Sequence, residues 1–96
     1  MTNKNTCILY NEVNDVYQKL LEYCAANGFK VKEINDKFYL IKAKKSSIFF
    51  WRTMKLELEI LLVEKRKVQI TVILFKNRKR QPELEEATII AIEGIF

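Results

Sequence analysis

The chain has 96 residues, 49% of them hydrophobic, with two glycines and one proline. This composition is typical of a single folded domain, here residues 1–96, and argues against a disordered chain or a loop-rich scaffold. The formal net charge of +5 favours encounters with polyanions and says nothing of the fold. Because the chain has no histidine and two cysteines, zinc centres and imidazole-dependent catalysis are not expected, and we predict no cofactor and no metal.

The chain is expected to be cytoplasmic. Residues 1–6 are polar, unlike the start of a secretory signal peptide. The longest apolar runs are far shorter than the roughly 20 residues that cross a bilayer. Cys7 and Cys24 fall in segments patterned as a strand and as an apolar helix face, where free cysteine packs as a small hydrophobe. We therefore expect no disulfide framework.

The first elements expected are a short strand and an amphipathic helix. Residues 6–10 are β-prone and mostly apolar. Asn11 offers a side-chain oxygen suited to a helix N-cap, and Asn27 with Gly28 suits the end of the helix. Between them, apolar residues recur three and four apart and so share one helical face. They are Val13, Val16, Tyr17, Leu20, Leu21 and Cys24.

Four strands are predicted next. After Gly28 the pattern alternates, and Asn35, Asp36 and Lys37 then favour a turn before a strand at 38–44. The clearest alternation runs over about 50–63, which is typical of a sheet with one packed and one wet face. A polar turn at 64–67 leads to a final strand at 68–75.

The C-terminal segment is predicted to be a second helix. Pro82 stands where a first helical residue would be, and Glu83, Glu85 and Glu86 place acid near the helix N-terminus. The β-branched residues within 88–92 leave a strand as the alternative there. The expected fold class is α+β, a curved, mostly antiparallel sheet of about five strands with both helices on one face.

The order strand, helix, four strands, helix resembles the TATA-binding-protein-like (β-α-β4-α) fold, as found in small uncharacterised bacterial domains. The junction Asn27-Gly28-Phe29 is similar to the helix-to-strand junction of such domains. The resemblance is one of topology, covers nearly the whole chain and carries no motif, so no functional residue is transferred. It implies that the helix-free sheet face is a candidate ligand surface, since TATA-binding proteins use that face for DNA.

The helix-free face is the first candidate site, because it carries more apolar residues than a solvated face needs. The aromatic run at 48–51 either closes the core or is exposed beside this face. Both features favour a non-catalytic binding or interaction module, whose occupant would be a protein partner, a second copy of the chain or an apolar small ligand. The candidate binding face comprises Phe38, Leu40, Phe49, Trp51, Ile73 and Phe75.

A basic rim is the second candidate. In a meander, the end of one strand lies beside the start of the next, so basic residues at these positions should meet at one end of the sheet. One interpretation of these residues is an anion-binding rim for nucleic acid or anionic lipid. The other interpretation is a solvated rim whose charge the acidic residues of the last helix partly neutralise. The rim comprises Lys42, Lys44, Lys45, Arg52, Lys76, Arg78, Lys79 and Arg80.

Catalytic groups are sparse in the sequence. Glu57 and Glu59 share one strand face and could pair as acid and base. Lys55 shares that face, however, so a charge-balanced surface is the better interpretation. A cysteine nucleophile would lack an activating base. We expect no enzyme activity.

Overall fold

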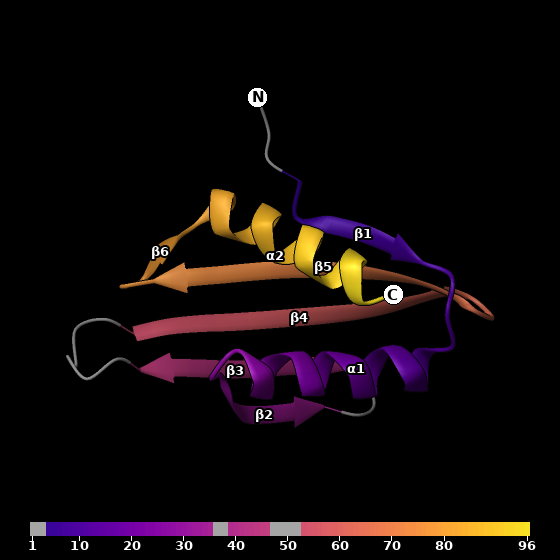
Figure 1. Cartoon of the computed structure of the whole chain (residues 1–96), viewed down its shortest axis with the longest axis horizontal. Coiled ribbons are helices and arrows are strands. Elements are labelled where there is room, and N and C mark those ends of the chain that lie inside the picture. The colour runs from indigo at the N-terminus through magenta and orange to yellow at the C-terminus, as the bar shows by residue number, and fades with distance from the viewer. Residues whose placement is uncertain (1–3, 36–38, 47–52) are drawn as a thin grey trace.

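The structure is a computed structural model and describes residues 4–35, 39–46 and 53–96 (Figure 1). Two helices and a largely antiparallel sheet confirm the predicted α+β class. In chain order the elements are β1 (Thr6–Leu9), α1 (Val13–Ala26), β2 (Lys30–Asn35), β3 (Leu40–Ser46), β4 (Thr53–Glu64), β5 (Lys67–Lys76), β6 (Lys79–Arg80) and α2 (Pro82–Ile95).

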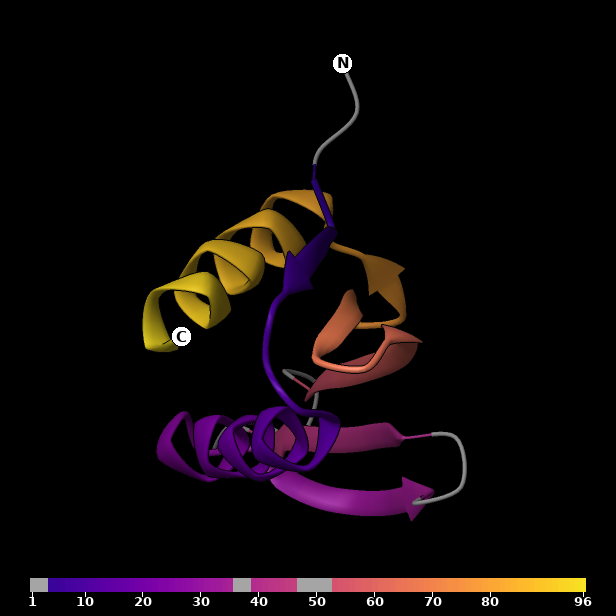
Figure 2. The same ribbon diagram turned by 90° about the vertical axis from the view of Figure 1, so that its right-hand side faces the viewer.

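The sheet has the strand order β1-β5-β4-β3-β2, and β6 pairs with the end of β5. Every strand pair is antiparallel. β1 and β2 lie at opposite edges of the sheet, and α1 connects the two strands along the chain. Both helices lie on the same side of the sheet, α1 over β2 and β3 and α2 over β1 and β5 (Figures 1 and 2). No helix of the described residues lies on the opposite face, which is called the helix-free face below.

The core lies between the sheet and the two helices. Alternate residues of the long strands are buried, as the twofold side-chain period of a strand requires. α1 and α2 bury residues spaced three and four apart against them. The largest fully buried apolar side chains are Leu20, Ile41, Leu56, Leu58, Ile70, Ile89 and Ile92.

The outer edge of β5 is covered piece by piece. β1 pairs with residues 68–71 and β6 with residues 75–76. Between them, the Val72 amide donates to the Asn5 carbonyl at 2.8 Å, and Asn5 Nδ2 donates to the Val72 carbonyl at 3.3 Å. Backbone groups that would otherwise offer a template for another strand are therefore satisfied within the chain.

Helix and strand starts differ from the predicted ones in two places. The N-cap of α1 is Glu12 rather than Asn11, because the Val16 amide bonds to the Glu12 carbonyl at 3.1 Å and closes the first turn there. β3 begins at Leu40 rather than at residue 38, because Tyr39 has a φ of 48° and so belongs to the preceding turn.

Two further predictions concern the C-terminal part. The alternative strand at 88–92 is wrong, because α2 runs unbroken through it and buries Glu85, Thr88, Ile89 and Ile92 along one face. β6 was not predicted, since Lys79 and Arg80 have no apolar alternation. It forms because the two-residue turn before it folds the chain back onto β5.

Candidate functional site

Strand register assigns the helix-free face its residues. Because Ile41, Leu56 and Leu74 are buried towards the helices, their sequence neighbours point to the other side. Ile73 and Phe75 of β5 and Leu40 of β3 thus lie on the helix-free face, each half-buried. Three more members of the candidate binding face, Phe38, Phe49 and Trp51, lie outside the described residues.

Rows of side chains cross this face from β3 to β5. Lys44 pairs with Lys55 on β4, and Lys55 pairs with Phe75, so two lysines and an aromatic ring form one row. The next row runs from Lys42 through Glu57 to Ile73. Positive charge is therefore concentrated at the end of the face where β3 and β5 finish, and a carboxylate limits it on one side.

This end of the face is hollowed into a basic concavity of about 790 Å³. Its floor is formed by side chains of β3, β4 and β5, and its rim by the turn between β5 and β6. Its volume falls in the range of ligand pockets, and charged groups and an aromatic ring share its lining. The lining residues are Lys44, Thr53, Lys55, Glu57, Phe75, Asn77 and Arg78.

The turn that forms the rim is strained at one position. Asn77 has a φ of 53° and Arg78 a φ of 68°. Two-residue hairpin turns with positive φ at both central positions usually carry Asn-Gly, since asparagine and glycine tolerate this conformation. Arginine occupies the position that glycine would fill without strain. This turn places Arg78 in the lining of the concavity.

The predicted basic rim does not form one surface. Lys45 lies on the helix side of β3, where its Nζ is 5.8 Å from the centre of the Phe29 ring. Arg80 forms an ion pair with Glu85 of α2. Lys44 and Arg78 are the rim members that line the concavity. Lys42, Lys76 and Lys79 do not line it, and Arg52 lies outside the described residues.

Glu85 fixes α2 to the end of β5. Its carboxylate is buried and accepts hydrogen bonds from the Leu74 amide at 2.8 Å and from Arg80 Nε and Nη2 at 2.7 and 2.9 Å. The Gln81 amide donates to the Leu74 carbonyl at 3.0 Å and completes the attachment. Burial alone would raise the pKa of Glu85, but the bonds from Arg80 and Leu74 and the guanidinium charge outweigh it and lower the pKa.

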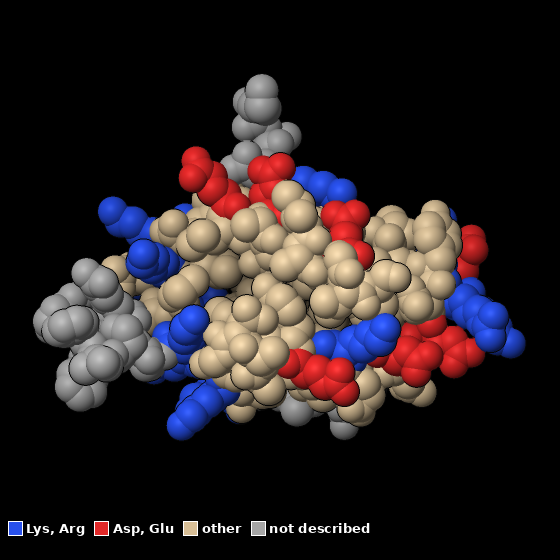
Figure 3. Space-filling view, viewed as in Figure 1, with Lys and Arg blue, Asp and Glu red and all other residues tan. Residues whose placement is uncertain are grey.

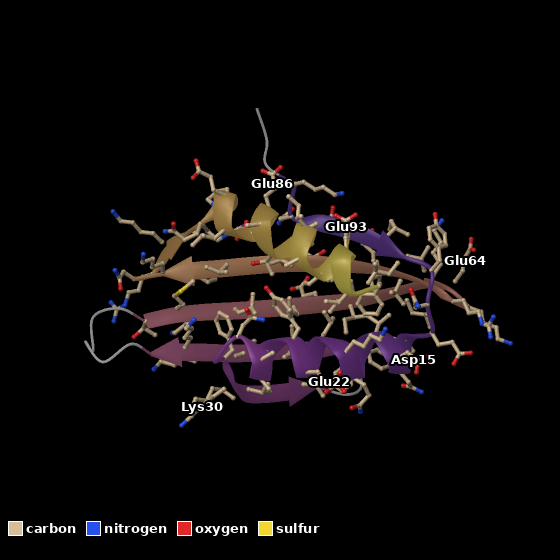
Figure 4. All side chains as sticks on the ribbon, in the orientation of Figure 1. Asp15, Glu22, Lys30, Glu64, Glu86 and Glu93 are labelled. Carbon is tan, nitrogen blue, oxygen red and sulfur yellow. The ribbon has the colours of Figure 1, made fainter. Side chains whose placement is uncertain are left out.

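Charges on the helix-covered side are arranged differently. Figure 3 shows several lysine and arginine side chains at the end of the sheet beside β6, acidic residues along α2, and both acidic and basic residues at the opposite end. In Figure 4, Glu86 and Glu93 point outward from α2, and Asp15 and Glu22 lie along α1. Glu93 accepts from Lys4 at 3.1 Å. The acidic groups labelled there lie away from the basic concavity.

The two thiols do not contribute to the concavity. Cys7 and Cys24 are both buried and unpaired by a disulfide. Burial raises the pKa of the Cys24 thiol to about 11. Burial, with the nearby Glu93 carboxylate, also raises the pKa of Cys7, against a smaller opposite effect of Lys4. Neither thiol has the electropositive, exposed setting that activates a nucleophile.

Sequence reasoning found part of the concavity. Lys44, Arg78 and Phe75 were among the predicted site residues, whereas Lys55, Asn77 and Thr53 were not. Lys55 was assigned to the same face as Glu57, but its position opposite Lys44 depends on the register between β3 and β4. The signal that could have found Asn77 is its place before Arg78 in a short polar connection, which is typical of a hairpin turn.

Within the described part of the chain, no cluster of three or more potential metal ligands occurs, and no helix is long and apolar enough to cross a membrane. No model of a known protein family matches the chain, and no curated protein is detectably similar to it.

Proposed function

We propose that this chain is a binding module that holds an anionic ligand in the basic concavity, and that the ligand is single-stranded nucleic acid. The observation that carries the proposal is that Lys44, Lys55 and Arg78 line the same concavity as the half-buried Phe75. Cations beside an aromatic ring on which a base stacks are the recurring components of single-strand binding. Glu57 limits the cationic surface to one end of the sheet.

The width of the concavity favours a single strand over a duplex. Its floor is formed by three adjacent strands, which span about 10 Å at the usual spacing of about 4.8 Å. This width suits one or two nucleotides with the base on Phe75 and the phosphates at the lysines. An exposed aromatic face makes such binding tolerant of sequence, because every base can stack.

The conformation of Arg78 supports a role for its side chain. A left-handed conformation costs a residue with a Cβ about 1–2 kcal/mol. Strained positions of this kind occur where a side chain contributes to function at a cost in stability. At the rim of the concavity, that purpose would be contact with the anion.

Two general considerations agree with the proposal. The resemblance to the TATA-binding-protein-like fold supports use of the helix-free face by analogy of fold, without a shared motif. Two buried free thiols fit a reducing compartment, so we retain the cytoplasm as the proposed location.

The proposal is tested by fluorescence anisotropy with labelled oligothymidine, the matching duplex and polyglutamate over a range of salt concentrations. We expect the wild-type chain to bind the single strand with an affinity that falls with salt, by a slope of about −0.7 for each phosphate contact. Arg78→Gly should reduce the magnitude of that slope by about 0.7, since it removes one cation and puts glycine where the left-handed backbone conformation is unstrained. Phe75→Leu should weaken binding by about 1–3 kcal/mol through lost stacking.

Arg66→Gly is the matched control, because Arg66 also has a left-handed conformation, with a φ of 66°, but lies in the turn between β4 and β5. It should bind the oligonucleotide as the wild type does. Absence of salt-dependent binding, or equal loss in both arginine variants, would contradict the proposal. Binding of polyglutamate alone would assign the concavity to an acidic protein segment instead.

Association through the apolar part of the same face is the second candidate function. Leu40 and Ile73 are half-buried on this face although neither α1 nor α2 covers them. A second copy of the chain packed there would bury them. Sedimentation velocity at rising protein concentration tests this candidate: a dimer that Ile73→Thr dissociates is expected, and a monomer at all concentrations would exclude it.

A further inference from the structure

The end of the β4–β5 hairpin, opposite the basic concavity, exposes apolar side chains on both of its faces. Leu61, Leu62 and Val63 are 59%, 50% and 45% exposed. Gln69, on the helix-free face of β5, pairs with Leu61 of β4 and with Ile8 of β1. Leu61 and the exposed Ile8 therefore lie on either side of Gln69 on that face. Leu62 pairs with the buried Val68 and therefore points to the helix side. The hairpin extends past both helices (Figure 1).

Basic residues stand at the tip of this apolar segment. Lys65, Arg66 and Lys67 form and follow the turn. Lys67 Nζ is 5.9 Å from the centre of the Tyr10 ring, which is 73% exposed. An exposed tyrosine beside a lysine is an arrangement suited to a boundary between an apolar and an aqueous phase.

The backbone of the tip places a cation where glycine would be less strained. Arg66 has a φ of 66°, as Arg78 does in the other hairpin turn. Its guanidinium lies 3.4 Å from Glu12, and both side chains are largely exposed. This pair is weak in water and can be exchanged for contact with another anion. Glu64 lies at the same end of the molecule (Figure 4).

We propose that this hairpin end is a membrane-contact site, in which Leu61, Leu62 and Val63 enter the interface of an anionic bilayer and the basic tip contacts lipid phosphates. Apolar exposure on both faces of a projecting hairpin is the reason to choose a lipid surface. A rigid protein partner covers one face, whereas a fluid interface surrounds both. The charge of the basic tip complements anionic headgroups.

The acidic neighbours determine how the contact should depend on salt. Glu12 and Glu64 offset two of the three cations at the tip, so the apolar residues supply most of the attraction. Binding should therefore fall less with salt than binding in the concavity does, and should be stronger on anionic than on neutral vesicles.

Vesicle flotation tests the proposal with the full chain. We expect flotation with vesicles of phosphatidylcholine and phosphatidylserine in equal amounts, and weaker flotation with phosphatidylcholine alone. A variant carrying Leu61→Thr, Leu62→Thr and Val63→Thr keeps β-prone residues at exposed positions, so it should fold and lose at least about tenfold in vesicle affinity. Ile90→Thr, at an exposed apolar position of α2 away from the hairpin end, is the control that should float as the wild type does.

A local probe separates insertion from adsorption. Leu62→Cys offers one exposed thiol for an environment-sensitive dye, because Cys7 and Cys24 are buried. Its emission should shift to the blue on anionic vesicles. No shift, or unchanged flotation of the threonine variant, would overturn the proposal. A wild-type dimer that the threonine variant converts to a monomer, without vesicle binding, would assign the patch to self-association and equally overturn it. Oligonucleotide binding should be unaffected by the threonine variant, so this test is independent of the proposed function.

Discussion

Glu85 illustrates how a charged side chain can be retained in the interior. Glu85 and Gln81 anchor the start of α2 to β5: Glu85 accepts from the Leu74 amide, and the Gln81 amide donates to the Leu74 carbonyl. A buried carboxylate without partners would be strongly destabilising, but here one backbone amide and one guanidinium satisfy it. The side chain of Arg80 is 48% exposed, so solvent weakens the pair but does not compete for the buried carboxylate.

The lowered pKa of Glu85 predicts a pH dependence of stability. An unfolded glutamate has a pKa of about 4.3, so the stabilisation by the charged group is fully present above that pH. It is lost as the pH falls through the lower pKa of the folded state. Glu85→Gln should lose about 1–3 kcal/mol of unfolding free energy at neutral pH. The difference from the wild type should shrink in acid, as urea unfolding at a series of pH values would measure.

Glu86→Gln is the control for this prediction, because Glu86 points outward from the same helix (Figure 4). Its effect should stay within about 0.5 kcal/mol. A Glu85→Gln variant whose stability differs from the wild type by the same amount at every pH would contradict the assigned titration.

The elements with strong periodicity were predictable from the sequence. α1 shows apolar residues at helical spacing, and β4 and β5 alternate over many residues, so their types and facing sides were predicted correctly. β6 could not be found in this way, because two charged residues carry no periodic signal. Its pairing follows from positive φ at Asn77 and Arg78. The short polar connection indicates a turn there, but without glycine it does not specify this backbone conformation.

The part of the candidate site that depends on the alternation of side chains along a strand was predictable. That Phe75 and Ile73 lie on the same face of the sheet follows from the alternation along β5 alone. The row formed by Lys44, Lys55 and Phe75 requires the registers of two strand pairs, and these are set by turns of unknown length in the sequence. The ion pair that removes Arg80 from the basic rim depends on the packing of α2 and has no local signature.

The strain at the β5–β6 turn predicts opposite effects of two substitutions. Arg78→Gly relieves the left-handed strain but adds freedom to the unfolded chain, so the protein should become more stable by about 0–1 kcal/mol. Arg78→Val, which is β-branched, should lose about 1–2 kcal/mol. Thermal unfolding followed by circular dichroism would measure both. Equal effects of the two variants would show that the backbone conformation does not govern this position.

At the scale of the whole molecule, one buried core joins both helices with β1, β3, β4 and β5. Cys7 in β1 and Cys24 in α1 belong to the same buried cluster although they lie on different elements. The sheet extends this core along the longest dimension of the molecule, 42 Å, and the two proposed binding surfaces lie at opposite ends of it. Variants at one end should therefore leave binding at the other unchanged.

The buried thiols provide a measure of how cooperatively this core opens. The pKa of Cys24 near 11 and the raised pKa of Cys7 leave little thiolate at pH 8, and both sulfurs are buried. We expect a thiol reagent such as dithiobis(nitrobenzoate) to react with neither at an appreciable rate in the native protein, and with both rapidly in guanidinium. If the domain opens as one unit, the slow native reaction should modify both thiols at the same rate. Rapid reaction of one thiol alone would show a separate local opening.

The interrupted edge of β5 has a consequence for assembly. At that edge the sheet ends in β1 and β6, strands of four and two residues. Between them, Asn5 and Glu85 form hydrogen bonds with the backbone of Val72 and Leu74. A filament of sheets joined edge to edge needs a long free strand on both sides of each molecule. Among the described strands, β2 at the opposite edge is the one that offers a longer row, of six residues. Pairing of β2 with its counterpart in a second molecule would exhaust the available edge and yield a closed pair, so growth by strand addition stops at two copies.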